Sequence, residues 1–240
     1  MLVSDRARRQ RYWWIALLAC LMACGAENVE RSQRAGAGGP EAIAPAAEER
    51  APRIVLFLGT SLTAGSGVAQ GEAFPARIQE RIQAAELPFR VINGGVSGDT
   101  SAGGLRRLDW LLRQAVDVLV LELGANDMLR GLDIAAMREN LQEIVDRTRE
   151  AHPEIRLVVA GMRAAPNMGE AYISGFEASF PALATRNHGS LIPFLLEGVA
   201  ADPDLNQPDG IHPTPEGHQI VADTVWQVLE PILRDPRREG

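Results

Sequence analysis

The sequence predicts an α/β protein with a parallel, doubly wound β-sheet. Short apolar runs rich in branched residues alternate along the chain with longer segments whose apolar residues recur at helical spacing. The short runs are almost continuously apolar, which is typical of strands that helices cover on both faces. Ligands of such sheets bind beyond the carboxyl ends of the strands, so we expect the functional residues on the loops that follow the strands.

Strands and helices are expected in strict alternation along the chain. Pro88 ends the first helix, Asp133 caps the third, and Pro215 lies in the first turn of the last. Phe180 and Pro181 are expected to break the fourth helix. The strands are predicted at residues 53–59, 89–93, 116–123, 155–161 and 191–194, and the helices at residues 74–87, 105–114, 133–151, 171–187 and 214–233.

The first 24 residues have the pattern of a secretory signal. Four arginines precede an apolar run, Tyr12–Ala23, which is too short to span a bilayer. The run leads into Leu21-Met22-Ala23-Cys24, which resembles the lipobox of bacterial lipoproteins, although Met22 is larger than the residue usual there. We therefore expect a lipoprotein-type signal peptide over residues 1–24 and a lipid on Cys24. The alternatives are modification of Cys20, an ordinary signal peptide cut near Ala23 or Ala26, and an uncleaved anchor.

Residues 25–52 form a segment of different composition. They are rich in alanine, glycine, glutamate and proline and have too few large aliphatic residues to bury a core. We expect a disordered linker there, followed by a single folded domain over residues 53–235 and a short tail at residues 236–240. The expected protein is an exported monomer, tied by its lipid to the cell envelope at the outer membrane or the periplasmic face.

The charged residues and cysteines exclude several classes of function. All 24 basic residues are arginine, so pyridoxal phosphate catalysis, a serine–lysine dyad and a P-loop, which need a lysine amine, are ruled out. The net charge of −7 argues against a nucleic-acid partner, because such partners are bound by neutralising phosphates. Cys20 and Cys24 are the only cysteines, so the rest of the chain has no CxxC zinc site and no disulfide. We expect no metal and no cofactor.

Four polar or glycine-rich segments hold the candidate functional residues. Taken singly, each is as well explained by a turn or a helix cap. Together they offer a serine, flexible backbone amides, a side-chain amide and a carboxylate–imidazole pair, which are the groups that acyl transfer to a serine requires. The segments are Gly59–Gly65, Asn93–Thr100, Gly124–Asp127 and Asp209–Pro213.

Ser61, Asp209 and His212 are the candidate catalytic residues. A serine hydroxyl is a weak nucleophile that needs a base, which His212 would supply, and Asp209 three residues earlier would orient the imidazole. The Ser61 and Gly98 amides and the Asn126 side chain are the candidate oxyanion donors. We expect activity to fall at acid pH, because a protonated His212 cannot act as a base.

These four segments resemble the blocks of the SGNH (GDSL) hydrolase family, which is named for its Ser, Gly, Asn and His. The resemblance covers residues 53–233, and it implies a flavodoxin-like three-layer sandwich with a five-stranded parallel sheet. Residues 96–101 and 163–184 are most similar to the thioesterase, arylesterase and lysophospholipase subgroup. That subgroup implies carboxylic ester or thioester substrates, including lysophospholipids, cleaved through an acyl-enzyme. Thr60 stands where the family has aspartate, which puts the fine positioning of Ser61 in question.

Apolar residues on the loops above the predicted catalytic edge suggest an acyl or aryl pocket. Met128 and Leu129 follow Asn126, and Met168 lies after the fourth strand, although packing of these loops against one another would explain the same pattern. Two alternative functions remain, a carbohydrate O-acetylesterase of the same family and a non-catalytic binding lipoprotein. His218, six residues after His212, is expected at the surface.

Overall fold

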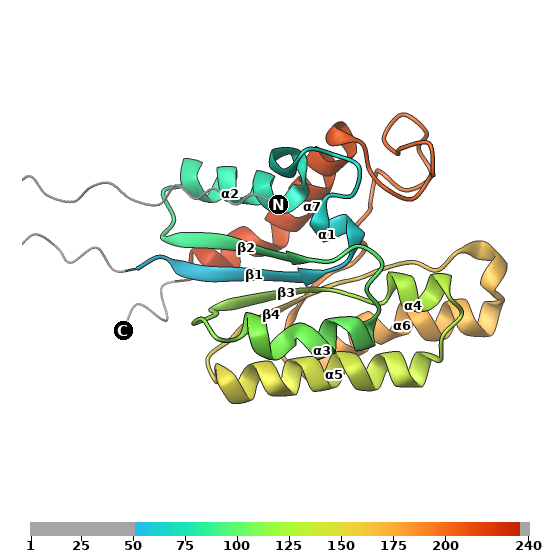
Figure 1. The fold of residues 1–240 in the computed structure, drawn as a ribbon, viewed down its shortest axis with the longest axis horizontal. Coiled ribbons are helices and arrows are strands. Elements are labelled where there is room, and N and C mark those ends of the chain that lie inside the picture. The colour runs from blue at the N-terminus through green and yellow to red at the C-terminus, as the bar shows by residue number, and fades with distance from the viewer. Residues whose placement is uncertain (1–50, 236–240) are drawn as a thin grey trace, which may run out of the picture. The chain divides into compact units, whose positions relative to one another are not determined.

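A five-stranded parallel sheet forms the middle layer of residues 51–235, the part of the chain that the computed structural model describes (Figure 1). The strands stand in the order β2-β1-β3-β4-β5, so the chain winds outward from β1 in both directions. This places the point where the winding reverses, the usual ligand site of such sheets, beside the carboxyl end of β1. The strands are β1 (Arg53–Gly59), β2 (Phe89–Gly95), β3 (Val118–Glu122), β4 (Arg156–Ala160) and β5 (Ser190–Ile192).

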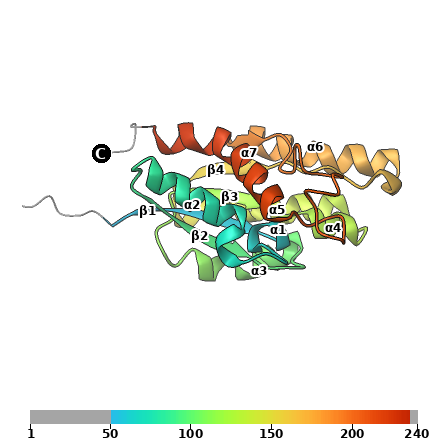
Figure 2. The ribbon, with the colours of Figure 1, turned by 90° about the horizontal axis from the view of Figure 1, so that it is seen from above.

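Helices cover both faces of the sheet. α2 (Phe74–Ala84) and α7 (Pro215–Leu233) pack on one face, and Figure 2 looks onto this pair. α3 (Ser101–Leu111), α5 (Ile134–Ala151) and α6 (Glu170–Arg186) pack on the other. The α/β fold and the five-stranded parallel sheet expected from the sequence are therefore confirmed.

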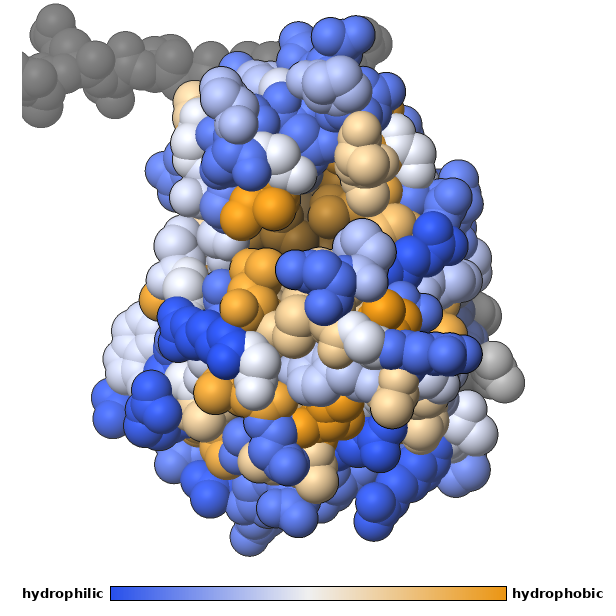
Figure 3. All heavy atoms as spheres, turned by 90° about the vertical axis from the view of Figure 1, so that its right-hand side faces the viewer, coloured by the Kyte–Doolittle hydropathy of each residue, from blue (hydrophilic) through white to orange (hydrophobic). Residues whose placement is uncertain are grey.

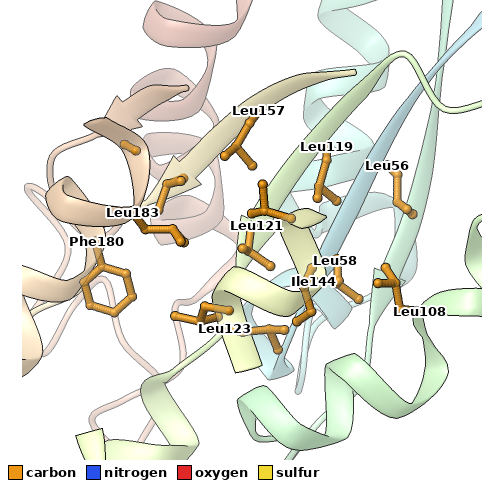
Figure 4. Close-up of a cluster of buried hydrophobic side chains, with 14 of the residues drawn as sticks. Leu56, Leu58, Leu108, Leu119, Leu121, Leu123, Ile144, Leu157, Phe180 and Leu183 are labelled. Carbon is orange, nitrogen blue, oxygen red and sulfur yellow. The ribbon is translucent and has the colours of Figure 1, made fainter. Parts of the chain in front are cut away.

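The alternation of side chains along each strand divides the core between the two faces. Val55 and Phe57 of β1 pack with α2 and α7, whereas Leu56 and Leu58 pack toward α3 and α5, as Figure 4 shows for the second group. All four side chains are fully buried. Complete burial of one such side chain is worth about 1.5–3 kcal/mol, so both layers hold the sheet in place.

Three helices differ from the prediction, and the first, α2, ends at Ala84 and not at residue 87. α3 begins at Ser101 and not at residue 105, because Thr100 caps it by accepting a hydrogen bond of 3.3 Å from the Gly103 amide. α6 runs through Pro181 without a break. Pro181 is on the exposed side of the helix, and the edge-to-face packing of Phe176 and Phe180, with ring centroids 5.1 Å apart, holds the other side against the core.

The short elements lie in the loops at the carboxyl edge and beside α2. They were not predicted, because single turns are too short to show a hydrophobic period. They are α1 (Ser61–Ala64), α4 (Ala125–Leu129) and the 3₁₀ turns Gln70–Glu72 and Pro166–Met168.

The predicted signal peptide, the lipidation at Cys24, residues 25–50 of the predicted linker and the tail at residues 236–240 lie outside the described residues. Within residues 51–235, none of the helices is long and apolar enough to cross a bilayer. In the same part of the chain, no group of three or more His, Cys, Asp or Glu side chains is arranged to hold a metal ion.

Candidate active site

The four predicted segments meet at the carboxyl edge of the sheet. Ser61, Gly98, Asn126 and His212 all line one cleft of about 690 Å³. Figure 3 looks onto this edge and shows apolar side chains in and around a hollow. The structure therefore brings the candidate nucleophile, base and oxyanion donors together in the place that the sheet topology favours.

Ser61, His212 and Asp209 form a continuous chain of hydrogen bonds. His212 Nδ1 is 2.6 Å from Asp209 Oδ2, and His212 Nε2 is 2.8 Å from Ser61 Oγ. An ionised carboxylate can only accept, so Nδ1 holds the imidazole hydrogen and Nε2 accepts from the serine hydroxyl. This is the arrangement in which the imidazole can take the serine proton.

A tight turn holds Asp209 and His212 in register. Asp209 Oδ1 accepts from the Ile211 amide at 3.0 Å and from the His212 amide at 3.1 Å. Gly210 adopts a φ of 74°, which a residue with a side chain rarely adopts. The bond from the His212 ring, and then the two amide bonds, lower the pKa of Asp209 to about 2, so the carboxylate is ionised when the imidazole takes the serine proton.

The loop after β2 and the turn of α4 supply the candidate oxyanion donors. Gly98 has a φ of 81°, which presents its backbone to the cleft without a side chain in the way. Asn126 Nδ2 donates to the Asp99 carbonyl at 2.8 Å. Since an amide nitrogen has two hydrogens, this bond fixes the side chain and leaves the other hydrogen for a ligand.

Asp127, the residue after Asn126, anchors α4 to α3. Its carboxylate is buried and accepts from the Ser101 amide at 2.8 Å and from the Ser101 hydroxyl at 2.6 Å. Asn140 of α5 donates to the same hydroxyl at 3.0 Å. A buried carboxylate satisfied in this way fixes the backbone that presents Asn126.

Glu122 is a buried carboxylate beneath the nucleophile that the sequence analysis did not single out. It accepts from the amides of Thr60 and Thr63 at 2.8 and 3.2 Å and from both threonine hydroxyls, the shortest at 2.7 Å. Burial raises the pKa of Glu122, and these four donors oppose that shift. A Cβ on Gly59 would lie 2.5 Å from the Glu122 carboxylate, so only glycine fits there. Thr60, which replaces the aspartate usual in the family, donates its hydroxyl hydrogen to Glu122 and so helps to hold this carboxylate in place.

Arg107 is a second residue that the sequence analysis did not single out. Its guanidinium donates to the carbonyls of Gly59 at 2.9 Å and Gly94 at 2.5 Å, and to the Asp99 carboxylate at 2.6 Å. It therefore joins the ends of β1 and β2 to the loop that contains Gly98. The only signal in the sequence is an arginine on the face of a helix that packs on the sheet.

Two of the three apolar residues predicted to form the pocket line the cleft, and the third does not. Met128 and Leu129 line the cleft, together with Met162, Phe194, Leu195 and other apolar residues. Met168 is not among the lining residues, because it lies in the 3₁₀ turn before α6 and packs, half-buried, against the α5 and α6 core. The interpretation of Met168 as part of the pocket is therefore not supported by its position.

His218 is buried, and the expectation that it lies at the surface is wrong. Only 1% of it is exposed, and its Nδ1 accepts from the Phe74 amide at 3.3 Å. Burial lowers the pKa of His218 to about 4. Its position on α7, three, four and seven residues before the buried Val221, Ala222 and Val225, is the helical pattern that could have predicted this.

Comparisons with known proteins agree with this geometry. The GDSL-like Lipase/Acylhydrolase family matches residues 57–220. Esterase TesA of Pseudomonas aeruginosa is 36% identical over 187 residues, which are 78% of this chain and 92% of that protein. Thioesterase 1/protease 1/lysophospholipase L1 of Escherichia coli K12 is 36% identical over 180 residues, 75% of this chain and 84% of that protein.

A solved structure shows the same fold. The psychrotrophic esterase EstA from Pseudoalteromonas sp., in a form inhibited by monoethylphosphonate, superposes with a TM-score of 0.71 at 31% identity. The match covers 76% of this chain and all of that one. The motif residues meet in one cleft, and the family match spans most of the described residues. The chain therefore belongs to the GDSL-like lipase/acylhydrolase family, the SGNH hydrolases that its sequence resembles.

Proposed function

We propose that this chain is a serine hydrolase that cleaves carboxylic esters or thioesters through an acyl-enzyme on Ser61. The observation that supports it best is the chain of hydrogen bonds from Ser61 through His212 to Asp209, which opens into the cleft. Such a chain provides a nucleophile, a base and a group that fixes the base in one tautomer.

The proposed reaction has two halves. In the first, Ser61 Oγ attacks the acyl carbon while His212 Nε2 takes its proton, and the carbonyl oxygen becomes an oxyanion held by the Gly98 and Ser61 amides and the Asn126 side chain. His212 then gives the proton to the departing alcohol or thiol, leaving an acyl-serine. In the second, His212 removes a proton from water, the hydroxide attacks the acyl carbon, and the proton returns to Ser61 as the carboxylic acid leaves.

The lining of the cleft supports an acyl substrate larger than acetyl. Met128, Leu129, Met162 and Phe194 make the part of the cleft around the candidate site apolar, and 690 Å³ lies within the range of sites for medium-sized ligands. The names of the relatives, an esterase and a thioesterase/lysophospholipase, point the same way. We infer arylesters, acyl thioesters and lysophospholipids as the substrate class, and we retain lipid attachment at Cys24 and an envelope location as part of the proposal.

Substitution of Ser61 tests the proposed nucleophile. Ser61→Ala should abolish hydrolysis of p-nitrophenyl esters and labelling by a phosphonate ester, the class of inhibitor bound to the Pseudoalteromonas esterase. The matched control is Ser174→Ala, which changes an exposed serine on α6 outside the cleft and should leave both unchanged. Activity of Ser61→Ala near that of the unsubstituted protein would refute the assignment.

A screen of acyl-chain length separates the alternatives. The proposed function predicts higher kcat/KM for acyl chains longer than acetyl, because the apolar lining adds contacts with each methylene. A carbohydrate O-acetylesterase would instead favour acetyl groups. A non-catalytic binding lipoprotein would hydrolyse none of the esters and would not be labelled by the phosphonate.

A further inference from the structure

Exposed apolar side chains are concentrated around the cleft. Among residues 51–235, the large hydrophobic side chains that remain exposed are Trp110 on α3 and a group of four at the carboxyl edge of the sheet. The four, which we call the apolar rim, are Val96, Leu129, Leu132 and Ile211, and each is between 42% and 51% exposed. Exposed apolar side chains are ordinary when scattered, but a group of them in one place marks an interaction site.

Half of the apolar rim lines the cleft, and the other half lies next to lining segments in the chain. Leu129 and Ile211 line the cleft themselves, Val96 directly precedes the lining residues Ser97 and Gly98, and Leu132 lies three residues beyond Leu129. The four residues belong to three separate segments, after β2, after β3 and beside His212. Figure 3 shows apolar side chains both within the hollow and on the surface next to it.

The backbone of the apolar rim is fixed, so these side chains are held out toward solvent. The Val96 amide donates to the Gly59 carbonyl at 3.1 Å, and the Leu132 amide donates to the Asp127 carbonyl at 2.9 Å. The Leu132 carbonyl also accepts from the Tyr172 hydroxyl at 3.0 Å. Loops that are bonded to the framework in this way present a preformed apolar surface.

The position of the rim at the mouth of the cleft favours a lipid aggregate over a protein as its binding partner. A protein partner or a second copy of the chain bound there would close the mouth above Ser61 and block the substrate. A lipid aggregate does the opposite, because it brings acyl chains to the mouth and offers them an apolar path into the cleft. The net charge of −7 disfavours an anionic lipid surface and leaves a zwitterionic one.

We propose that the apolar rim docks the enzyme on the surface of zwitterionic lipid aggregates, so that an ester passes from the aggregate directly into the cleft. This inference rests on the proposed function and adds to it that the substrate is taken from a lipid surface and not from solution. Apolar burial drives such docking, so it depends little on salt.

The length of the chain before Arg53 is compatible with docking on the membrane that would hold Cys24. β1 begins at Arg53, at the edge of the sheet opposite the cleft (Figure 1). Residues 25–52 span at most about 95 Å when fully extended. β1 is roughly 20 Å long, which is the distance between the edge where it begins and the edge that carries the cleft. The segment before Arg53 is several times longer, so the rim can face the membrane that would hold Cys24.

The test compares one substrate in two physical states. Lysophosphatidylcholine is offered to the full chain as monomers and as micelles, and the rate is followed across the critical micelle concentration. The rim variant is Val96→Ser with Leu132→Ser, because neither side chain lines the cleft. The matched control is Trp110→Ser, which removes the exposed hydrophobic residue that lies outside the rim.

We expect the rate of the unsubstituted protein to rise when micelles form. In the rim variant this increase in rate should be at least fivefold smaller, while the rates on monomers and on p-nitrophenyl acetate stay the same. Trp110→Ser should behave as the unsubstituted protein does. The proposal is overturned if the rim variant keeps the rise, if it loses monomer and micelle rates equally, or if the rim instead proves to mediate self-association in sedimentation. Absence of all ester hydrolysis would refute the proposed function itself, a different result.

Discussion

Arg107 donates a hydrogen bond of 2.9 Å to the carbonyl of Gly59, two residues before Ser61. The same guanidinium binds Gly94 at the end of β2 and the carboxylate of Asp99, whose carbonyl in turn accepts from Asn126. One arginine thus connects the backbone that presents the proposed nucleophile with the loop that fixes the proposed oxyanion donors. We infer that Arg107 is a positioning residue, since it acts on the site through other groups.

Arg107→Met should lower kcat for p-nitrophenyl esters by about 10- to 100-fold with a smaller change in KM, because displacement of reacting groups by about 1 Å costs that much. Arg107→Lys should restore only part of the loss, since an ammonium lacks the fork that reaches several acceptors at once. Arg106→Met, which changes the exposed neighbour, is the control. If kcat falls only as much as the folded fraction measured by circular dichroism, the role is purely structural.

Thr60→Asp restores the residue usual in the family and should destabilise this chain. The Thr60 hydroxyl donates to Glu122 at 3.0 Å, whereas a carboxylate there would have to hold a proton to do so. Two adjacent buried carboxyls share a proton in the folded protein, whereas in the unfolded chain both lose their protons near pH 4. The folded variant therefore binds more protons than the unfolded one, and its free energy of unfolding falls as pH rises above about 4. The deficit in Tm relative to the unsubstituted protein should therefore be larger at pH 8 than at pH 5.

Thr60→Ser keeps the hydroxyl and is the control for that change. It should match the unsubstituted protein at both pH values. A Thr60→Asp deficit that is the same at pH 5 and pH 8 would mean that crowding, and not shared ionisation, causes the loss.

The residues that could be predicted from the sequence are those on short polar segments after apolar strands. Ser61 and Asn126 interrupt the hydrophobic pattern where the chain leaves the sheet, and His212 lies in the polar loop before α7, so the sequence indicates both their position and their chemistry. Glu122 and Arg107 lie inside a strand and a helix, where one charged residue in an apolar pattern gives no indication of its partner. Their contacts with Gly59 and Thr60 join segments 48 to 62 residues apart, and only the folded chain brings these together.

The acid limb of the pH–rate profile should have a slope of one. The pKa of Asp209 is lowered to about 2 by its bond to His212 and by two backbone amides, so this carboxylate stays ionised in mild acid. Asp209 therefore takes up no proton between pH 7 and pH 3, so the loss of log(kcat/KM) in acid should reflect protonation of the catalytic base alone. A slope of two over part of this range would show that Asp209 titrates with the imidazole.

The buried His218 should make the protein less stable in mild acid. Burial, and then the nearby charge of His212, lower its pKa from 6.5 to about 4, with Glu72 opposing the shift. Between these two pH values the unfolded chain holds a proton that the folded chain excludes, so the free energy of unfolding falls as pH drops below 6.5, by about 3 kcal/mol at pH 4.

His218→Gln should flatten this dependence in urea unfolding measured from pH 7 to pH 4, whereas His188→Asn, at an exposed histidine, should leave it unchanged. An undiminished dependence in His218→Gln would assign the acid sensitivity to other groups.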